Sequence, residues 1–376
     1  MIENKGVQNI VLKENKKNVP WSPPDIGEEE KNAAKRIIDS AWLTQGKETE
    51  AFEEDIKKYI GCKHTIVVNS GTSALITALL AHGIGPGDEV IVPTFTFIAS
   101  VNAILSVGAK PVLVDSDLET FNTTPEIMKN VITEKTKAII PVDVGGMSID
   151  INAFTEFARK NNLIFIQDSA ESIGAEYGGK KVGSFDHTSV FSFHMAKLAT
   201  TVEGGCVLTN DDEIAEKCRM IRNHGMQGKY DYKCFGLNFR ITDIQAAIGR
   251  IQLRKLNGYI RLRNKLADIY KKGLGDKIEY QKVPDYVNVH PYMLFGILTD
   301  VEKRDSIIKL LNENGVGTRI CWLPTHKQDY HRKIFEGNYP NSELLASRII
   351  NLPMGNGLTE KDVNYVVKVF NKILEK

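Results

Sequence analysis

Seven short apolar runs between residues 64 and 210 alternate with stretches that carry a helical pattern, and this alternation constrains the fold most. The runs are HTIVVN (64–69), EVIV (89–92), PVLVD (111–115), AIIPV (138–142), LIFIQD (163–168), SVFSF (189–193) and GCVLTN (205–210). Most of them lack polar alternation, which is typical of strands buried on both faces. The pattern predicts an α/β fold, with helices on both faces of a mostly parallel seven-stranded sheet.

The pattern changes in the last third of the chain. Residues 241 to about 272 predict one long or broken helix. A strand is expected at 292–299, a helix at 301–314, and GTRICWL (317–323) is a candidate for one more strand. A T-x-x-D sequence at Thr359 predicts the capped start of a last helix.

Two domains are expected, although no Pro-, Gly- or Ser-rich linker separates them. The large domain covers residues 1–255 and a smaller α+β domain covers residues 256–376. The first twenty residues mix both charges and lack an apolar segment. They predict a loose N-terminal arm rather than a signal peptide.

Composition excludes several classes of partner. The chain has 376 residues and a formal net charge of +1, so no global field attracts nucleic acid or an anionic membrane. No apolar run approaches the ~18–20 residues of a membrane span. The five cysteines are scattered and form no C-x-x-C pair. We therefore expect a cytoplasmic protein without a metal site, in which self-association is permitted.

The sequence NSGTSAL (69–75) follows a predicted strand and opens a predicted helix. The free N–H groups at a helix N-terminus, together with two hydroxyls, form a natural site for a phosphate. An ordinary strand-to-helix turn with a Ser or Thr cap is the alternative. The segment is not a P-loop, because the lysine of that motif is missing.

Three further motifs carry polar residues at the ends of predicted strands or in loops. Asp168 ends a buried strand, where open α/β sheets bind ligands, although it is also a plausible turn or cap residue. Lys197 lies in a loop between two buried strands, and a solvated surface lysine is the alternative. Asn238 and Arg240 precede a helix start and either face a site or serve as loop and cap residues.

Together, a phosphate-type turn, a strand-end aspartate and a loop lysine match the needs of pyridoxal phosphate. A lysine amine binds that cofactor covalently as a Schiff base. An aspartate keeps the pyridine nitrogen protonated, so that the ring can take up electrons. A helix N-terminus and hydroxyls hold the phosphate.

Five ordered stretches resemble the DegT/DnrJ/EryC1/StrS family of sugar aminotransferases. They are NSGTSAL, PTFTFIASVNAI, DSAESIGAEYGGKKVGS, FSFHMAKLATTVEGG and GLNFRITDIQAAIG, and the resemblance covers nearly the whole chain. It implies a fold-type I aminotransferase that uses pyridoxal 5'-phosphate and its pyridoxamine form (PLP and PMP). It also implies a large domain with a smaller C-terminal domain.

The resemblance assigns roles position by position. Lys197 resembles the lysine that binds the cofactor covalently, and Asp168 resembles the partner of the pyridine nitrogen. Gly71, Thr72 and Ser192 resemble the ligands of the cofactor phosphate.

Four more positions acquire a role from the family. Phe97 matches the aromatic residue that stacks on the cofactor ring, with simple core packing as the alternative. Asn238 resembles the residue that reaches the phosphate from a neighbouring subunit, which implies a homodimer with shared active sites. His194 and Arg240 are expected to contact the substrate.

Two positions depart from the usual family pattern. Glu171 stands where Gln or His is common in the family. In having glutamate at this position, the chain resembles the branch of the family that makes 4-amino sugars such as perosamine. Glu171 either binds the cofactor's ring hydroxyl or a sugar hydroxyl, or it is structural. Val202 stands where glycine is usual. Members that dehydrate sugars can carry His at the lysine position, so Lys197 weakens that alternative.

The resemblance implies transfer of an amino group from an amino acid, by family habit L-glutamate, to a nucleotide-linked keto-6-deoxy sugar, at C4. The alternatives are a sugar 3-aminotransferase, another PLP reaction such as sugar dehydration, and a non-catalytic regulatory protein on the same fold. The sequence leaves the sugar and the nucleotide open.

Overall fold

The computed structural model describes residues 17–275, 278–320 and 322–375. All seven predicted strands form one sheet in the order β1-β9-β8-β5-β4-β2-β3. Only β9 runs antiparallel to its neighbours, which confirms the mostly parallel sheet. The strands are β1 (His64–Val68), β2 (Glu89–Pro93), β3 (Lys110–Val114), β4 (Thr136–Ile139), β5 (Ile164–Asp168), β8 (Thr188–Ser192) and β9 (Gly205–Thr209).

Helices cover both faces of this sheet, so alternate strand residues enter two different cores. On β1, Ile66 and Val68 pack with one cluster, whereas Val67 packs with the other. The first cluster lies under α3 (Gly71–Ala81), α4 (Ala99–Ser106) and α7 (Asp212–Arg222). The second lies under α2 (Lys47–Ile60), α6 (Ile151–Lys160) and α8 (Asp243–Leu274). Burial on both faces explains why the runs lack polar alternation.

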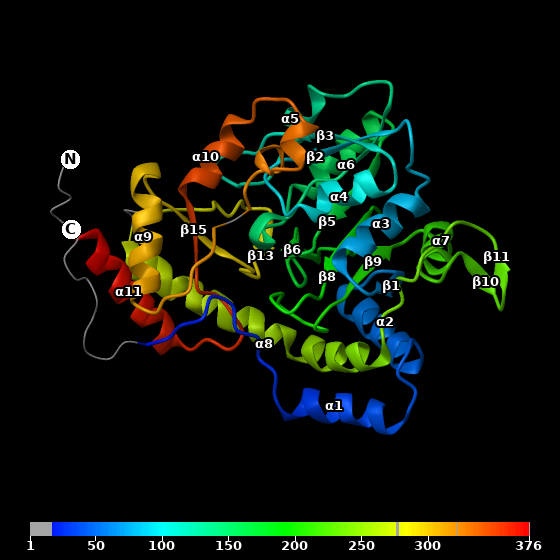
Figure 1. Ribbon diagram of the computed structural model, residues 1–376, viewed down its shortest axis with the longest axis horizontal. Coiled ribbons are helices and arrows are strands. Elements are labelled where there is room, and N and C mark those ends of the chain that lie inside the picture. The colour runs from blue at the N-terminus through cyan, green and yellow to red at the C-terminus, as the bar shows by residue number, and fades with distance from the viewer. Residues whose placement is uncertain (1–16, 276–277, 321, 376) are drawn as a thin grey trace.

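The C-terminal elements lie together beside the large sheet (Figure 1), and they pack around a separate cluster of apolar side chains. A small antiparallel sheet contains β12 (Glu279–Tyr280), β14 (Phe295–Leu298) and β15 (Ile349–Leu352). It is accompanied by α9 (Val301–Glu313), α10 (Pro340–Arg348) and α11 (Glu360–Leu374). The helix α8 crosses residue 255, so the division into 1–255 and 256–376 stays a prediction.

Two local predictions for this part of the chain have clear outcomes. Thr359 and Asp362 form the predicted capping box at the start of α11. The candidate strand at 317–323 is wrong for the residues that the structure describes there. Arg319 makes one isolated bridge to Asn351, and no longer ladder forms in those residues.

The smaller elements flank the large sheet. Helix α1 (Glu28–Asp39) packs on α8, and the hairpin of β10 (Met226–Gly228) and β11 (Asp231–Tyr232) projects from the body (Figure 1). The remaining elements are α5 (Pro125–Lys129), β6 (Glu176–Tyr177), β7 (Lys180–Lys181) and β13 (Val287–Val289).

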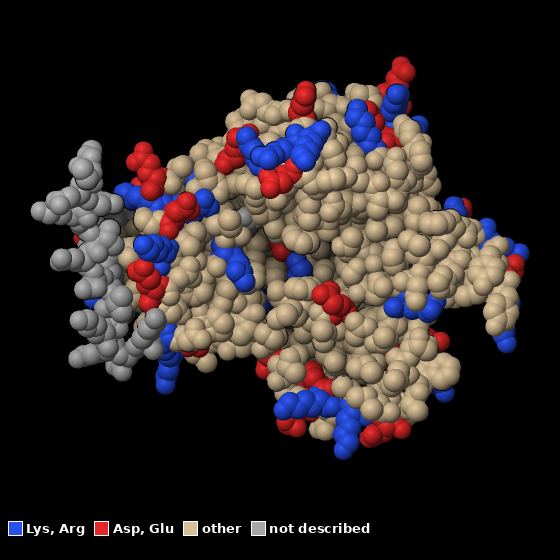
Figure 2. Space-filling model, in the orientation of Figure 1, with Lys and Arg blue, Asp and Glu red and all other residues tan. Residues whose placement is uncertain are grey.

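Most of the predicted N-terminal arm, residues 1–16, lies outside the described residues. At its end, Val19 is fully buried and bridges Val316, so the loose arm is wrong for that position. No helix of the described chain is long and apolar enough to cross a membrane. Figure 2 shows acidic and basic side chains interspersed over one face, in keeping with the net charge near zero.

Candidate active site

A cavity of about 490 Å³ opens at the carboxyl ends of β5 and β8, beside the first turn of α3. This is the edge at which open α/β sheets bind ligands. The cavity brings together all the predicted site residues except Asn238 and Arg240: Gly71, Thr72, Phe97, Asp168, Glu171, Ser192, His194 and Lys197.

One end of the cavity is formed where α3 approaches β8 very closely. A Cβ added to Gly71 would lie 2.9 Å from the Cβ of Ser192, so only glycine fits there. Ser70 caps the helix by accepting a hydrogen bond from the backbone N–H of Ser73. The N–H groups of the first helical turn lack intrahelical acceptors, and the Ser192 and Thr72 hydroxyls lie in the same lining. This end suits an anion such as a phosphate.

Asp168 lines the same cavity as a buried carboxylate. Its Oδ2 accepts a hydrogen bond from Ser100 Oγ at 2.7 Å, and its Oδ1 accepts one from the Ala170 N–H at 3.2 Å. Burial nevertheless raises the pKa of Asp168, because these hydrogen bonds offset only part of the desolvation. A cationic group in the cavity would restore the ionised form. Ser100 had no assigned role in the sequence.

Lys197 and Glu171 form an ion pair inside the cavity. Lys197 Nζ lies 3.0 Å from Glu171 Oε1, and both side chains are largely buried. Glu171 Oε2 accepts a hydrogen bond from the Gly145 N–H at 3.0 Å. Gly145 has φ +69°, a backbone conformation that favours glycine. Glu171 therefore faces the lysine, a contact that the sequence did not predict.

A buried polar network lies directly behind Asp168 and Glu171. The Asp143 carboxylate accepts hydrogen bonds from Gln167 Nε2, Ser172 Oγ and the Ile149 N–H. Burial raises the pKa of Asp143 to about 6. Gln167 and Ser172 neighbour Asp168 and Glu171 in the chain, so the network fixes the segment that presents both carboxylates. No sequence motif indicated Asp143.

Aromatic side chains line the mouth of the cavity. Phe97 is 56% exposed although it lines the cavity, which argues against simple core packing. Trp21 and Trp322 lie in the same lining, the first from the N-terminal segment and the second from the C-terminal part. Neither tryptophan belongs to a recognisable motif, so only the folded chain brings them here.

The loop after Lys197 carries the second departure from the family pattern. Val202 has φ +75°, which is strained for a β-branched residue and ordinary for glycine. The next residue, Glu203, lines the cavity, and its Oε1 lies 3.8 Å from Nε2 of His194. Both side chains are about half exposed, so they lie at the entrance rather than in its depth.

Asn238 and Arg240 lie near the phosphate-type turn but outside this cavity. The backbone oxygen of Asn238 accepts a hydrogen bond from Asn69 Nδ2 at 3.4 Å, and the Asn238 side chain is exposed. Arg240 donates to Asn223 Oδ1 at 2.7 Å. Within one chain, neither residue reaches the other predicted ligands.

The cavity fits the groups that pyridoxal phosphate presents. The first turn of α3 suits its phosphate, buried Asp168 suits its protonated ring nitrogen, and Lys197 offers an amine in the same cavity. A Cβ at Gly71 would fill the phosphate end.

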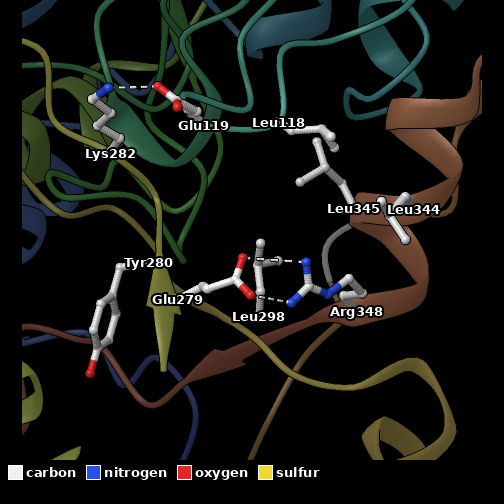
Figure 3. A pocket seen from close by; sticks show the side chains of 9 residues that line it. All are labelled: Leu118, Glu119, Glu279, Tyr280, Lys282, Leu298, Leu344, Leu345 and Arg348. Carbon is white, nitrogen blue, oxygen red and sulfur yellow. Dashed lines mark hydrogen bonds and ion pairs between the residues drawn. The ribbon is translucent and has the colours of Figure 1, made fainter. Parts of the chain in front are cut away.

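A second cavity, of about 330 Å³, lies between the loop after β3 and the small C-terminal sheet (Figure 3). Its charged side chains are paired with one another: Glu279 with Arg348 at 2.6 Å, and Glu119 with Lys282 at 2.6 Å. Figure 3 shows these two pairs apart from each other, and Tyr280 pointing away from the leucines. This cavity contains no predicted site residue.

Comparison with known proteins gives one family match and close relatives. The model of the DegT/DnrJ/EryC1/StrS aminotransferase family matches residues 24–371. GDP-perosamine synthase of Caulobacter vibrioides is 37% identical over 363 residues, which cover 93% of this chain and 97% of that protein.

Solved structures share the fold over nearly the full length. DesV of S. venezuelae is 32% identical, with a TM-score of 0.90, over 96% of this chain and 99% of that chain. Spr1654 of Streptococcus pneumoniae, solved in PLP and PMP forms, is 29% identical with a TM-score of 0.91, over 96% of this chain and 99% of that chain.

Proposed function

Because the chain belongs to the DegT/DnrJ/EryC1/StrS family and is a PLP-dependent aminotransferase, we propose that it aminates a nucleotide-linked keto-6-deoxy sugar at C4. The amino donor in this proposal is L-glutamate. The enzyme acts as a homodimer with shared active sites, in the cytoplasm, where the free thiols of Cys62, Cys206, Cys218 and Cys234 are stable.

The observation that carries the proposal is the Lys197–Glu171 pair in one cavity with Asp168. Pyridoxal phosphate supplies a carbon that accepts an amine and a ring that takes up electrons. Lys197 Nζ would hold the cofactor and, once the amine of the donor has taken its place, would be free to accept the proton from the donor's Cα. In the second half of the reaction Lys197 delivers a proton to the sugar carbon that receives the amine.

Asp168, Glu171 and the first turn of α3 assist the proton transfers by Lys197. Asp168 keeps a proton on the ring nitrogen, since a cation next to a buried carboxylate favours both charged forms. Glu171 accepts a hydrogen bond from Lys197 Nζ and orients the free amine. The first turn of α3 anchors the phosphate, which keeps the reacting atoms in register.

Amination at C4, rather than C3, is supported by Glu171 and by the relative that shares 37% identity. That relative is a GDP-perosamine synthase, and perosamine is a 4-amino sugar. The glutamate stands beside the lysine, where it can also accept a hydrogen bond from a sugar hydroxyl.

A homodimer is supported by exposed apolar side chains near Asn238. On and beside the β10–β11 hairpin, Tyr230 is 75% exposed, Tyr232 59% and Phe235 68%. Such a group of large apolar side chains is rare on a monomer surface and typical of an interface. Asn238 lies a few residues after the end of β11 and is exposed, so a partner docked on this surface would lie close to its side chain.

The substrate is tested by an amination assay over GDP-, UDP- and dTDP-linked 4-keto and 3-keto 6-deoxy sugars, with L-glutamate as donor. The proposal expects an amino sugar from a 4-keto substrate and conversion of the cofactor absorbance by L-glutamate. Amination of 3-keto sugars alone would support the 3-aminotransferase. No conversion with any amino donor would support a dehydratase or a regulatory protein.

Shared active sites are tested by mixing two inactive variants, Lys197→Ala and Asn238→Ala. A mixed dimer would carry both lesions in one site and neither in the other. Random exchange of subunits should therefore restore roughly a quarter of the wild-type activity. Absence of any restored activity, with exchange shown by differently tagged subunits, would contradict this part of the proposal.

A further inference from the structure

One buried cation lies behind the active site with neutral partners. Arg263 on α8 is 1% exposed, and the hydrogen bonds that the structure gives its guanidinium all go to neutral oxygens. Nε donates to Asn356 Oδ1 at 2.8 Å, and NH1 donates to the backbone oxygens of Tyr292 at 2.9 Å and Met293 at 3.2 Å. Burial lowers the pKa of Arg263 to about 9. Taking a charge of this kind out of water costs free energy, which hydrogen bonds to neutral oxygens offset only in part.

Both ends of this hydrogen-bond set reach the active site. Met293 lines the cavity that contains Lys197. Asn356 Nδ2 donates to the backbone oxygen of Leu198 at 2.8 Å, and Leu198 directly follows the lysine. One side-chain amide therefore connects α8 to the peptide next to Lys197.

The orientation of this amide is fixed by its neighbours. Oδ1 faces a guanidinium that can only donate, and Nδ2 faces a carbonyl that can only accept. Turning the amide over would place donor against donor and acceptor against acceptor. The buried charge of Arg263 thus leaves Asn356 a single satisfied orientation.

The turn that carries Asn356 is itself rigid. The Met354 N–H donates to the Trp21 oxygen at 2.8 Å, and the Gly357 N–H donates to the Pro23 oxygen at 3.1 Å. A Cβ on Gly355 would lie 2.6 Å from Pro23 Cδ, so the two segments are in close contact. The lysine loop is thereby held from a part of the chain far away in sequence.

We propose that Asn356 is a positioning residue for the reactive lysine, oriented by the buried cation of Arg263. Its hydrogen bond to the Leu198 oxygen holds the backbone next to Lys197 in place. The position of that backbone limits where Lys197 Nζ can reach between the cofactor and the substrate carbon. The inference rests on the role of Lys197 proposed above. Small displacements of a reacting group cost large factors in rate, so one such hydrogen bond affects catalysis more than stability.

The test is the variant Asn356→Asp, which separates the two contacts of the side chain. Next to Arg263 the new carboxylate stays ionised and keeps, or strengthens, the contact to the guanidinium. It cannot donate to Leu198, and its oxygen repels that carbonyl. The fold should therefore survive, while the hydrogen bond from residue 356 to the Leu198 oxygen, here called the tether, is lost.

Two rates report whether the hydrogen bond from residue 356 to Leu198 positions Lys197. The first is the rate at which pyridoxal phosphate, added to the cofactor-free protein, becomes linked to Lys197, followed by absorbance and by borohydride trapping with mass spectrometry. The second is the half-reaction with L-glutamate. Both should fall about tenfold in N356D, with the half-saturating glutamate concentration and the final extent of linkage unchanged.

The matched controls are Asn356→Ala and Asn371→Ala. Asn371 Nδ2 also donates to a backbone oxygen at 2.8 Å, that of Gly273, but it joins α11 to the end of α8 (Figure 1). N356A should slow both rates, and N371A should leave them within about twofold of wild type. Rates within twofold in N356D, or loss of its fold, would overturn the tether. A wild-type protein that links the cofactor elsewhere than Lys197 would overturn the proposed function as well.

Discussion

The two cavities of this protein contain similar charged side chains in opposite situations. In the cavity at α10, the partners are mainly solvent-accessible: Glu279 is 64% exposed, and Lys282 and Glu119 are 63% and 65% exposed. In the cavity at α3, Lys197 and Glu171 are 17% and 9% exposed, and Asp168 is buried. The first set of charges is mostly exposed to solvent, whereas the second set is largely buried.

The difference separates a structural arrangement from a reactive one. Exposed ion pairs contribute little to stability and are screened by salt. Buried charges cost stability, and a buried charge that lines a cavity marks a candidate functional site. The raised pKa of Asp168 reflects that cost.

The largest effect is expected from replacing one lysine in each cavity. Lys197→Ala should lower kcat by at least about a thousandfold and abolish the absorbance of covalently bound cofactor, because it removes the amine and the proton acceptor. Lys282→Ala should leave kcat within about twofold, since its ion pair is exposed. An active K197A enzyme with normal absorbance would remove the distinction between the cavities.

Asp168→Asn should separate activity from stability. Turnover should fall by at least about a hundredfold, because the ring nitrogen loses its charged partner. The cofactor-free variant should be more stable than wild type, since burial raises the pKa of Asp168 above its unfolded value of 3.8.

The sign of this pH dependence follows from linkage. A carboxyl with a raised folded pKa stabilises the fold below 3.8, and that stability is lost as the pH rises through the folded pKa. The advantage of D168N in urea unfolding should therefore grow from pH 4 to neutrality. A constant difference between the two proteins, or a less stable variant at pH 7, would contradict the account.

Glu171→Gln should have an intermediate effect. It keeps an oxygen for the Gly145 N–H but loses the charge beside Lys197. A hydrogen bond between charged groups contributes about 1.5–3 kcal/mol, so kcat should fall by roughly tenfold to a hundredfold. Glu343→Gln is the control, because Glu343 pairs with Lys327 outside both cavities. Equal kcat values for E171Q and wild type would show that the pair is only structural.

The smallest effect is expected from Arg348→Ala in the cavity at α10. Loss of its contacts to Glu279 and to the Thr299 backbone oxygen should cost about 1–2 kcal/mol of unfolding free energy, and the ion-pair part should shrink in 1 M salt. Activity should not change. A variant with reduced kcat would indicate that the two cavities are coupled across the molecule.

Much of the fold follows from local pattern, and the site follows only in part. The seven strands and the α11 capping box are visible in the sequence because apolar period and cap chemistry are local properties. Lys197, Asp168 and Gly71 are visible because each lies in a short motif next to a strand. Their roles stay predictions until the variants above are measured.

The remaining parts of the site depend on contacts between distant segments. Trp21 and Trp322 meet at the cavity mouth only after the N-terminal segment packs beside the C-terminal turn. Asp143 and Asn356 act through hydrogen bonds to residues far away in the chain, and neither belongs to a motif. The strand expected at 317–323 is wrong for the residues described there, among which Arg319 alone makes a bridge to β15.

The pairing of β1 with β9 also has a consequence for synthesis of the chain. Residues 64–68 form an edge of the sheet and pair only with residues 205–209. A nascent chain therefore carries an apolar strand without a partner until β9 has left the ribosome, and an unpaired strand of this kind invites pairing with other chains. Synthesis of β9 supplies the missing partner, because this strand lies between β1 and β8 in the sheet.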